Sequence, residues 1–180
     1  MSYCDYVLKP ECDPLHRHYH DCFYGFPIED DNELFGRLVI EINQAGLSWL
    51  TVLKKEKHFR MAFDNFDLEK VALYGEDDRQ RLLSDAGVIR NKLKVEAAIH
   101  NAAVILALRR KHGSFRQWLD LHHPLEKEAW VKLFKAHFRF TGGEIVNEFL
   151  MSTGYLPGAH HKNCAVYHEV LKSQPRWLTA

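Results

Sequence analysis

The segment from Asn91 to about Lys111 has the most regular hydrophobic pattern in the chain. Its apolar residues recur at intervals of three and four, the spacing of one face of an α-helix. They are Val95, Ala98, Ile99, Ala102, Ile105 and Leu106. A long helix with one apolar face must bury that face against other secondary structure. No segment of the sequence shows the alternation of apolar and polar residues that is typical of a β-strand, so we expect an all-α fold.

The same reasoning predicts helices through most of the interior. The helix from Asp31 to Ala45 has an acidic start and is followed by Gly46, and Ser48 can cap a helix from Trp49 to about Phe63. Further helices are predicted from Asp77 or Asp78 to Ser84, from Ser114 to before Pro124, from Glu126 to His137 and from Gly143 to Thr153. Both ends, rich in Pro, His and Cys, are expected to be irregular. We expect residues 1–180 to form one domain.

Charge balance limits the possible partners. The 180 residues include 24 Lys and Arg and 24 Asp and Glu, so a polyanion such as DNA must be bound by a local basic cluster. The sequence has no apolar stretch of signal-peptide or membrane-spanning length. We expect a soluble, cytoplasmic protein with no membrane partner. Its four cysteines are therefore interpreted as thiols or metal ligands in preference to disulfides.

A single carboxylate, Glu41, lies within the otherwise apolar stretch of residues 39–53. On the helix predicted there it shares a stripe with Leu34 and Leu38, so it points toward the core. An unpartnered buried charge is costly. Glu41 is therefore either bonded to a backbone amide or an arginine, or it lines a polar pocket. The pattern leaves both interpretations open.

Histidines and cysteines gather near the two ends of the chain. They are Cys4, Cys12, His16, His18, His20 and Cys22 on one side and His160, His161 and Cys164 on the other. One His/Cys pair from each end could form a tetrahedral zinc site that joins the termini. The long separation is not a zinc-finger pattern, and the alternative is a set of scattered surface histidines and buried free cysteines.

The stretch LLSDAGVIRNKLK, residues 82–94, lies between two predicted helices. A turn through Gly87 and a second helix that opens with basic residues have the layout of a helix-hairpin-helix. In such a motif the turn amides and the helix N-terminus can hold a DNA phosphate, with Arg90, Lys92 and Lys94 as counter-charges. A helix-turn-helix that only packs is the alternative.

Aromatic residues surround the predicted position of Glu41 in the sequence. Tyr19 and Tyr24 precede it, Trp49 follows it, and Tyr6 lies near the start. Aromatic planes around a carboxylate suit a flat, cationic ligand, which stacks on the rings while the carboxylate binds its polar edge. Each aromatic residue taken alone is equally compatible with an ordinary core.

Four stretches together resemble one known family. They are YHDCFYGFP (19–27), EINQAGLSWLTVLKK (41–55), SDAGVIRNKLKVEAAIHNA (84–102) and GYLPGAHHKNC (154–164). In this order they resemble the type I 3-methyladenine DNA glycosylases, bacterial alkylation-repair enzymes, and the block around QAGLSW is the most specific. The resemblance implies an all-α helix-hairpin-helix glycosylase in which a structural zinc ion joins the two ends. We expect the protein to be a monomer.

The resemblance also implies roles for individual residues. The zinc ligands would be Cys4, His20, His160 and Cys164, and the base pocket would contain Glu41, Tyr19 and Trp49, with Tyr6 and Tyr24 beside them. The reaction would hydrolyse the N-glycosidic bond of a methylated purine flipped out of double-stranded DNA, releasing free 3-methyladenine. Because methylation at N3 leaves the base cationic, Trp49 would stack on it, Glu41 would accept its hydrogen bonds, and Tyr19 would add a polar contact. The sequence identifies no general base.

Several positions depart from the family pattern. Phe23 and Tyr24 stand where the family usually has Glu and Trp, and Tyr6 stands where Trp is common. Gly158 and Ala159 replace the usual Asn-Asp pair. These changes bear on the shape of the pocket and on the preference among methylated bases.

Two other functions are compatible with the same residues. The first is a zinc-stabilised module that binds lesions in DNA without cutting. The second is a hydrolytic metalloenzyme, which is disfavoured because four protein ligands leave zinc no open position for water.

Overall fold

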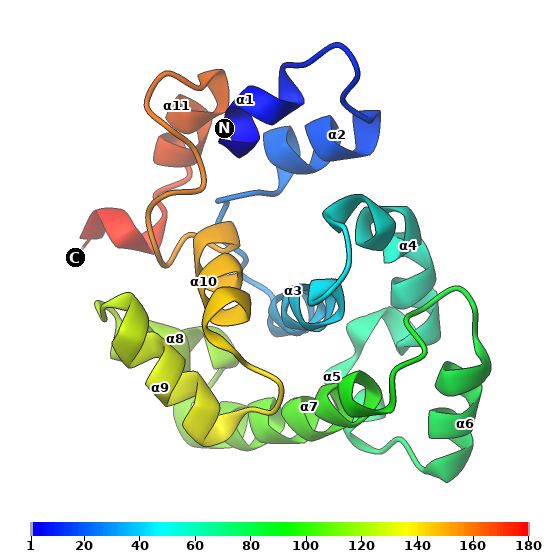
Figure 1. Cartoon of the computed structure of the whole chain (residues 1–180). Coiled ribbons are helices and arrows are strands. Elements are labelled where there is room, and N and C mark those ends of the chain that lie inside the picture. Colours follow the sequence, from blue (N-terminus) through cyan, green and yellow to red (C-terminus); the bar gives the residue numbers. More distant parts are fainter. Residues whose placement is uncertain (1, 180) are drawn as a thin grey trace.

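The computed structural model describes residues 2–179, and within that range it contains helices and no strands. The all-α prediction is therefore confirmed. Helix α3 (Asp31–Gln44) lies at the centre of the molecule (Figure 1). It contacts α4 (Trp49–Ala62), α7 (Lys92–His112), α8 (Phe115–His122) and α10 (Gly143–Ser152).

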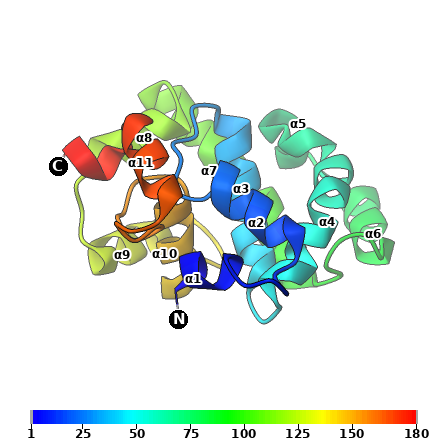
Figure 2. The same cartoon turned by 90° about the horizontal axis from the view of Figure 1, so that it is seen from above.

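The remaining elements surround this central group. They are α5 (Leu68–Ala72), α6 (Glu76–Ser84), α9 (Lys127–His137) and the 3₁₀ helices η1 (Asp64–Phe66) and η2 (Arg176–Thr179). The terminal helices are α1 (Tyr3–Val7), α2 (Pro14–Cys22) and α11 (Ala165–Lys172). Figures 1 and 2 both place α1 beside the loop that leads into α11. Within residues 2–179, no helix is both long and apolar enough to cross a membrane.

Helix α3 is fixed at its start by two aspartates. Asp30 caps the helix, because its side chain accepts a hydrogen bond from the Glu33 backbone N–H at 3.0 Å. The buried Asp31 carboxylate accepts hydrogen bonds from the backbone N–H groups of Phe115 (2.9 Å) and Arg116 (3.1 Å), which open α8. Asp31 also accepts a bond from Arg109 Nε at 3.1 Å. One acidic side chain thus holds α3, α7 and α8 together.

A glycine on α3 allows close packing with η1. A Cβ atom at Gly36 would lie 2.4 Å from the ring of Phe66, which is itself buried. Phe66 and the two residues before it have positive φ angles, so η1 presents the ring directly to the α3 backbone. This contact requires glycine at position 36.

The prediction that both ends are irregular is wrong. Ser2 and Asp5 form a capping box that starts α1. Asp13 caps α2 and Pro14 occupies its first turn, where proline's missing N–H costs nothing. These start signals are present in the sequence, and the His and Cys residues that follow them are compatible with helix. Helix α5 and η1, which were not predicted, are too short to show a periodic pattern.

Candidate functional site

A cavity of about 460 Å³ opens where the amino-terminal helices meet α3, the start of α4, and α10. Its lining residues are Tyr3, Tyr6, His16, Tyr19, Tyr24, Glu41, Gln44, Trp49, Glu144 and Glu148. All five residues that the sequence proposed for the base pocket, Glu41, Tyr19, Trp49, Tyr6 and Tyr24, are therefore brought to one cavity. Their chemical roles remain predictions.

Glu41 is the buried acid of this cavity, with 4% of its surface exposed. No group within residues 2–179 donates a hydrogen bond to its carboxylate, although it lines the cavity. Burial raises the pKa of Glu41 from 4.5 to about 8; the positive charge of Arg37 opposes this rise and the negative charge of Glu148 adds to it. Of the two interpretations of Glu41, the geometry favours a pocket residue over a core residue satisfied by hydrogen bonds.

Arg37 is a site residue that sequence reasoning missed. It lies one helical turn before Glu41 on α3, and its Nη1 donates a hydrogen bond to the Tyr19 hydroxyl at 3.1 Å. Its guanidinium also lies 5.1 Å from the centre of the Tyr19 ring. The i, i+4 spacing to Glu41 was the signal that could have found it.

Two aromatic rings form one wall of the cavity. The Tyr19 and Trp49 rings are 4.9 Å apart with an interplanar angle of 67°, an edge-to-face contact. Ser48 sets the position of Trp49, because its side chain caps α4 by accepting a hydrogen bond from the Thr51 N–H. Burial raises the pKa of Tyr19 above its ordinary range, so its hydroxyl stays protonated and can donate a hydrogen bond.

The opposite part of the lining comes from α10, which the sequence did not connect with the pocket. The Tyr24 hydroxyl donates a hydrogen bond to Glu148 Oε2 at 3.0 Å. Tyr3, also missed, contacts Tyr24 edge to face at 5.5 Å, and its hydroxyl lies 3.0 Å from His16 Nδ1. No sequence pattern links Glu148 to Glu41; only the packing of α10 on α3 brings them to the same cavity.

The four cysteine and histidine residues proposed as zinc ligands form one cluster. Their ligand atoms, Cys4 Sγ, His20 Nε2, His160 Nδ1 and Cys164 Sγ, all lie within 4.8 Å of one another. Individual separations are 3.2 Å between the two nitrogens and 3.7 Å from each sulfur to His160 Nδ1. A tetrahedral zinc site with ordinary bond lengths has edges of roughly 3.3–3.8 Å. The donor set and its spacing fit that ion.

The second ring nitrogen of each histidine also has a partner. His20 Nδ1 lies 2.7 Å from the Asp21 carboxylate, and His160 Nε2 donates to the backbone oxygen of Tyr24 at 2.7 Å. Such outer partners orient metal-binding imidazoles and fix which nitrogen faces the ion. Because Tyr24 lines the cavity, the cluster and the cavity wall are directly connected.

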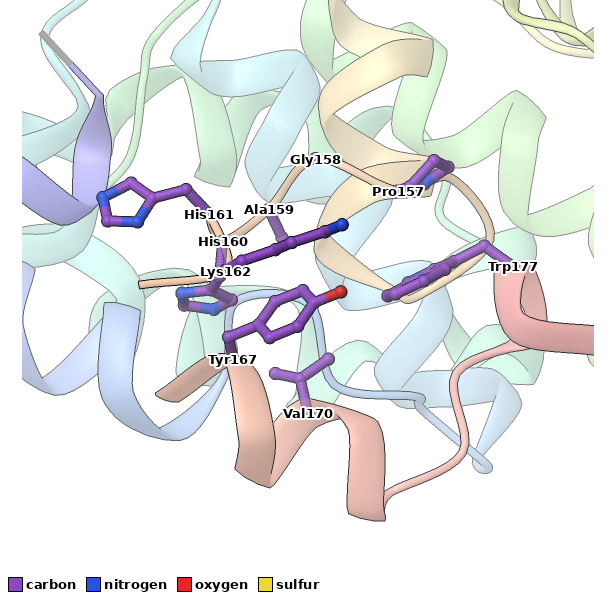
Figure 3. Close-up of a pocket in the computed structure, with 9 residues that line it drawn as sticks. All are labelled: Pro157, Gly158, Ala159, His160, His161, Lys162, Tyr167, Val170 and Trp177. Carbon is purple, nitrogen blue, oxygen red and sulfur yellow. The ribbon is translucent and has the colours of Figure 1, made fainter. Parts of the chain in front are cut away.

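A second cavity, of about 430 Å³, lies between the loop that carries His160 and the carboxyl-terminal segment (Figure 3). It is lined by Pro157, Gly158, Ala159, His160, His161, Lys162, Tyr167, Val170 and Trp177. The Tyr167 and Trp177 side chains enter it from the carboxyl-terminal segment (Figure 3). It shares no lining residue with the cavity of Glu41.

The predicted hairpin lies between α6 and α7, which contact each other. Asp85 closes the turn by accepting a hydrogen bond from the Gly87 N–H at 2.7 Å. Arg90 and Lys92 are exposed at the start of α7, where they can meet an anion.

Lys94 is placed differently from the sequence-based expectation. It is buried, and its Nζ donates hydrogen bonds to the backbone oxygens of Asn43 (2.9 Å) and Ala45 (2.7 Å) at the end of α3. The prediction of Lys94 as a surface counter-charge for phosphate is therefore corrected: it ties the start of α7 to the end of the helix that carries Glu41.

The burial of Glu41 predicts an unusual pH dependence of stability. Its folded-state pKa of about 8 exceeds the ordinary 4.5, so the folded protein binds this proton more tightly than the unfolded chain. Stability is therefore lost as pH rises from about 5 to about 8. Glu41→Gln removes this loss, and its free energy of unfolding relative to wild type should rise across that range by up to roughly 4 kcal/mol.

Urea unfolding at a series of pH values measures this difference. Glu69→Gln is the control for loss of a surface carboxylate, because Glu69 is exposed on α5, and it should show no rise of several kcal/mol across this range. A Glu41→Gln protein destabilised by the same amount at every pH would contradict a buried, unpaired carboxylate.

Comparison with known proteins places this geometry in a family. Residues 9–128 match the sequence model of the methyladenine glycosylases. DNA-3-methyladenine glycosylase 1 of Escherichia coli is 36% identical over 93% of this chain and 97% of its own length.

Two solved structures are also similar. The 3-methyladenine DNA glycosylase I of Staphylococcus aureus matches 92% of this chain and 97% of its own, with 29% identity and a TM-score of 0.78. A Tyr-to-Phe variant of a 3-methyladenine DNA glycosylase I, solved in complex with 3-methyladenine, matches the same shares with 30% identity and a TM-score of 0.79. The family match over most of the chain and the agreement in fold lead to one conclusion: this chain belongs to the methyladenine glycosylase family.

Proposed function

We propose that this protein is a DNA-3-methyladenine glycosylase, which hydrolyses the N-glycosidic bond of 3-methyladenine in alkylated DNA. The observation that carries the proposal is the buried Glu41 carboxylate, free of hydrogen-bond partners within residues 2–179, in a cavity walled by Tyr19 and Trp49. Such a group is costly unless a cation or a set of donors meets it. A flat, positively charged purine supplies both.

The proposed mechanism depends on recognition of the cation more than on acid catalysis. The methylated base, flipped out of duplex DNA, enters the cavity and stacks on Trp49. Glu41 accepts hydrogen bonds from the donor edge of the base, and this interaction strengthens in the dry cavity. Arg37 donates to the Tyr19 hydroxyl, so the hydroxyl hydrogen is left to donate to the base. We assign no general base to these residues.

The metal would have a structural role. We propose that Cys4, His20, His160 and Cys164 hold a zinc ion, which would join the amino-terminal helices to the loop before α11. The ion would supply four metal–ligand bonds and leave no position open for water. Its effect on the pocket would be indirect, because His20 follows Tyr19 on α2 and His160 contacts the backbone of Tyr24.

The α6–α7 connection would bind the DNA backbone as a helix-hairpin-helix. The proposal is supported by the glycine turn, by the N-terminus of α7, and by the exposed Arg90 and Lys92 beside it. We further propose that the protein acts as a monomer on double-stranded DNA in the cytoplasm.

Release of free base from methylated DNA tests the proposed activity. Wild-type protein should release 3-methyladenine, and Glu41→Gln should reduce the rate by about 100-fold or more, because it removes the charge that meets the cation. Glu69→Gln, remote from the cavity, should keep the wild-type rate. Lesion binding by the wild type without base release would show a binding module instead of an enzyme.

Metal content tests the cluster. Purified protein should contain one zinc per chain, and Cys164→Ser should lose the metal and lower the melting temperature. Cys22→Ser is the matched control, because Cys22 is an exposed free cysteine outside the cluster, and it should change neither quantity. Wild-type protein without zinc would remove the assignment of all four ligands.

Charge removal tests the hairpin. Arg90→Ala and Lys92→Ala should each weaken binding to methylated and unmethylated DNA equally, and each should reduce the log–log salt slope by roughly 0.9. Lys111→Ala, an exposed lysine at the opposite end of α7, should leave both unchanged. A selective loss of binding to methylated DNA would contradict a phosphate-binding role.

A further inference from the structure

Two further carboxylates line the cavity, and the mechanism above uses neither. One of them, Glu144, is exposed and pairs with Lys127. Glu148 comes from α10 and lines the same cavity as Glu41. The Tyr24 hydroxyl holds it by donating a hydrogen bond to Oε2 at 3.0 Å. Tyr24 is also a position where this chain departs from the tryptophan that the family pattern leads us to expect.

Glu148 has no cation partner among residues 2–179. Burial raises its pKa, while the hydrogen bond from Tyr24 opposes the rise. The charge of Lys127 also opposes the rise, but its ion pair is formed with Glu144 at 3.3 Å. No lysine or arginine is among the residues that line the cavity. Arg37, whose charge acts on Glu41, donates its hydrogen bond to the Tyr19 hydroxyl, and no ion pair in the described part of the chain joins it to Glu148.

The single hydrogen of the Tyr24 hydroxyl is already used in the bond to Glu148. Tyr24 therefore fixes the carboxylate in place and cannot donate to a ligand at the same time. The carboxylate retains further acceptor sites, because an ionised carboxylate can accept about four hydrogen bonds. A cationic ligand favours the ionised form of a nearby carboxyl group, so it meets a negatively charged acceptor on the α10 side as well as on the α3 side.

We propose that Glu148, held by Tyr24, is a specificity-determining residue that makes the cavity prefer a cationic base over a neutral one. This inference rests on the proposed function of the same cavity. A cationic purine gains attraction from both carboxylates, whereas a neutral base must displace their water without that gain. The pair therefore rejects undamaged bases that enter the cavity, a selection that stacking on Trp49 alone cannot provide.

Binding of two small probes tests this role. The permanently cationic 3,9-dimethyladeninium and the neutral 9-methyladenine are titrated calorimetrically into wild type, Glu148→Gln and Tyr24→Phe. In Glu148→Gln the amide oxygen can still accept from Tyr24, so only the charge is lost. Affinity for the cation should fall roughly tenfold, while affinity for the neutral probe should stay constant or rise. Tyr24→Phe should reduce the preference for the cation by roughly threefold, because the carboxylate is no longer fixed.

Controls separate this inference from the proposed function. Glu69→Gln should bind both probes as wild type does. Equal loss of both probes in Glu148→Gln, or an unchanged preference in Glu148→Gln, would show a merely structural residue and overturn the inference. If Glu148→Gln does not fold, an unchanged preference in Tyr24→Phe overturns it. If wild type binds the cation, and Glu41→Gln weakens this binding while Glu148→Gln does not, only this inference is refuted. If wild type neither binds the cation nor releases base, both the inference and the proposed function are refuted.

Discussion

The site depends on the burial of one carboxylate, Glu41, on the central helix α3. Desolvation raises its pKa to about 8, which means that ionising this carboxyl group costs the folded protein free energy. The surroundings of α3 offset that cost: α4, α7, α8 and α10 are among the helices that pack on it, and Asp31 anchors its start to α7 and α8. At its other end, Lys94 binds the last backbone oxygens. A helix fixed at both ends keeps Glu41 facing the cavity, where a cation can compensate its charge.

The two termini complete the cavity that α3 begins. Adjacent residues on α2 face different neighbours: Tyr19 lines the cavity and His20 belongs to the Cys/His cluster. His160 joins the same cluster and also donates to the backbone oxygen of Tyr24. The cluster therefore helps to position Tyr19 and Tyr24 in the lining of the cavity. With Glu148 added from α10, the cavity combines flat rings with negative charge, a combination suited to a cationic purine and poorly suited to a phosphate or a neutral base.

The sequence predicts the parts of this arrangement that depend on the local spacing of apolar and polar residues. The interior helices follow from hydrophobic spacing, and the position of Glu41 on the stripe of Leu34 and Leu38 already indicated its burial. The terminal helices α1 and α11 were not predicted because, at five and eight residues, they are too short to show a clear apolar period. Glu148 could not be predicted, since only the packing of α10 against α3 brings it to the cavity. Lys94 was wrongly assigned to the surface because the pattern of basic residues does not show which way a side chain turns.

The ionisation of Glu41 is the most direct test of this account. Carbon-13 labelling of the glutamate carboxyl groups, with Glu41 identified by the signal that Glu41→Gln loses, gives its pKa by NMR titration. The free protein should show a pKa of about 8. Saturation with 3,9-dimethyladeninium should lower it by at least roughly one unit, because a bound cation favours the charged carboxylate, whereas 9-methyladenine should not lower it. An ordinary pKa in the free protein, or a pKa that the bound cation leaves unchanged, would contradict the account.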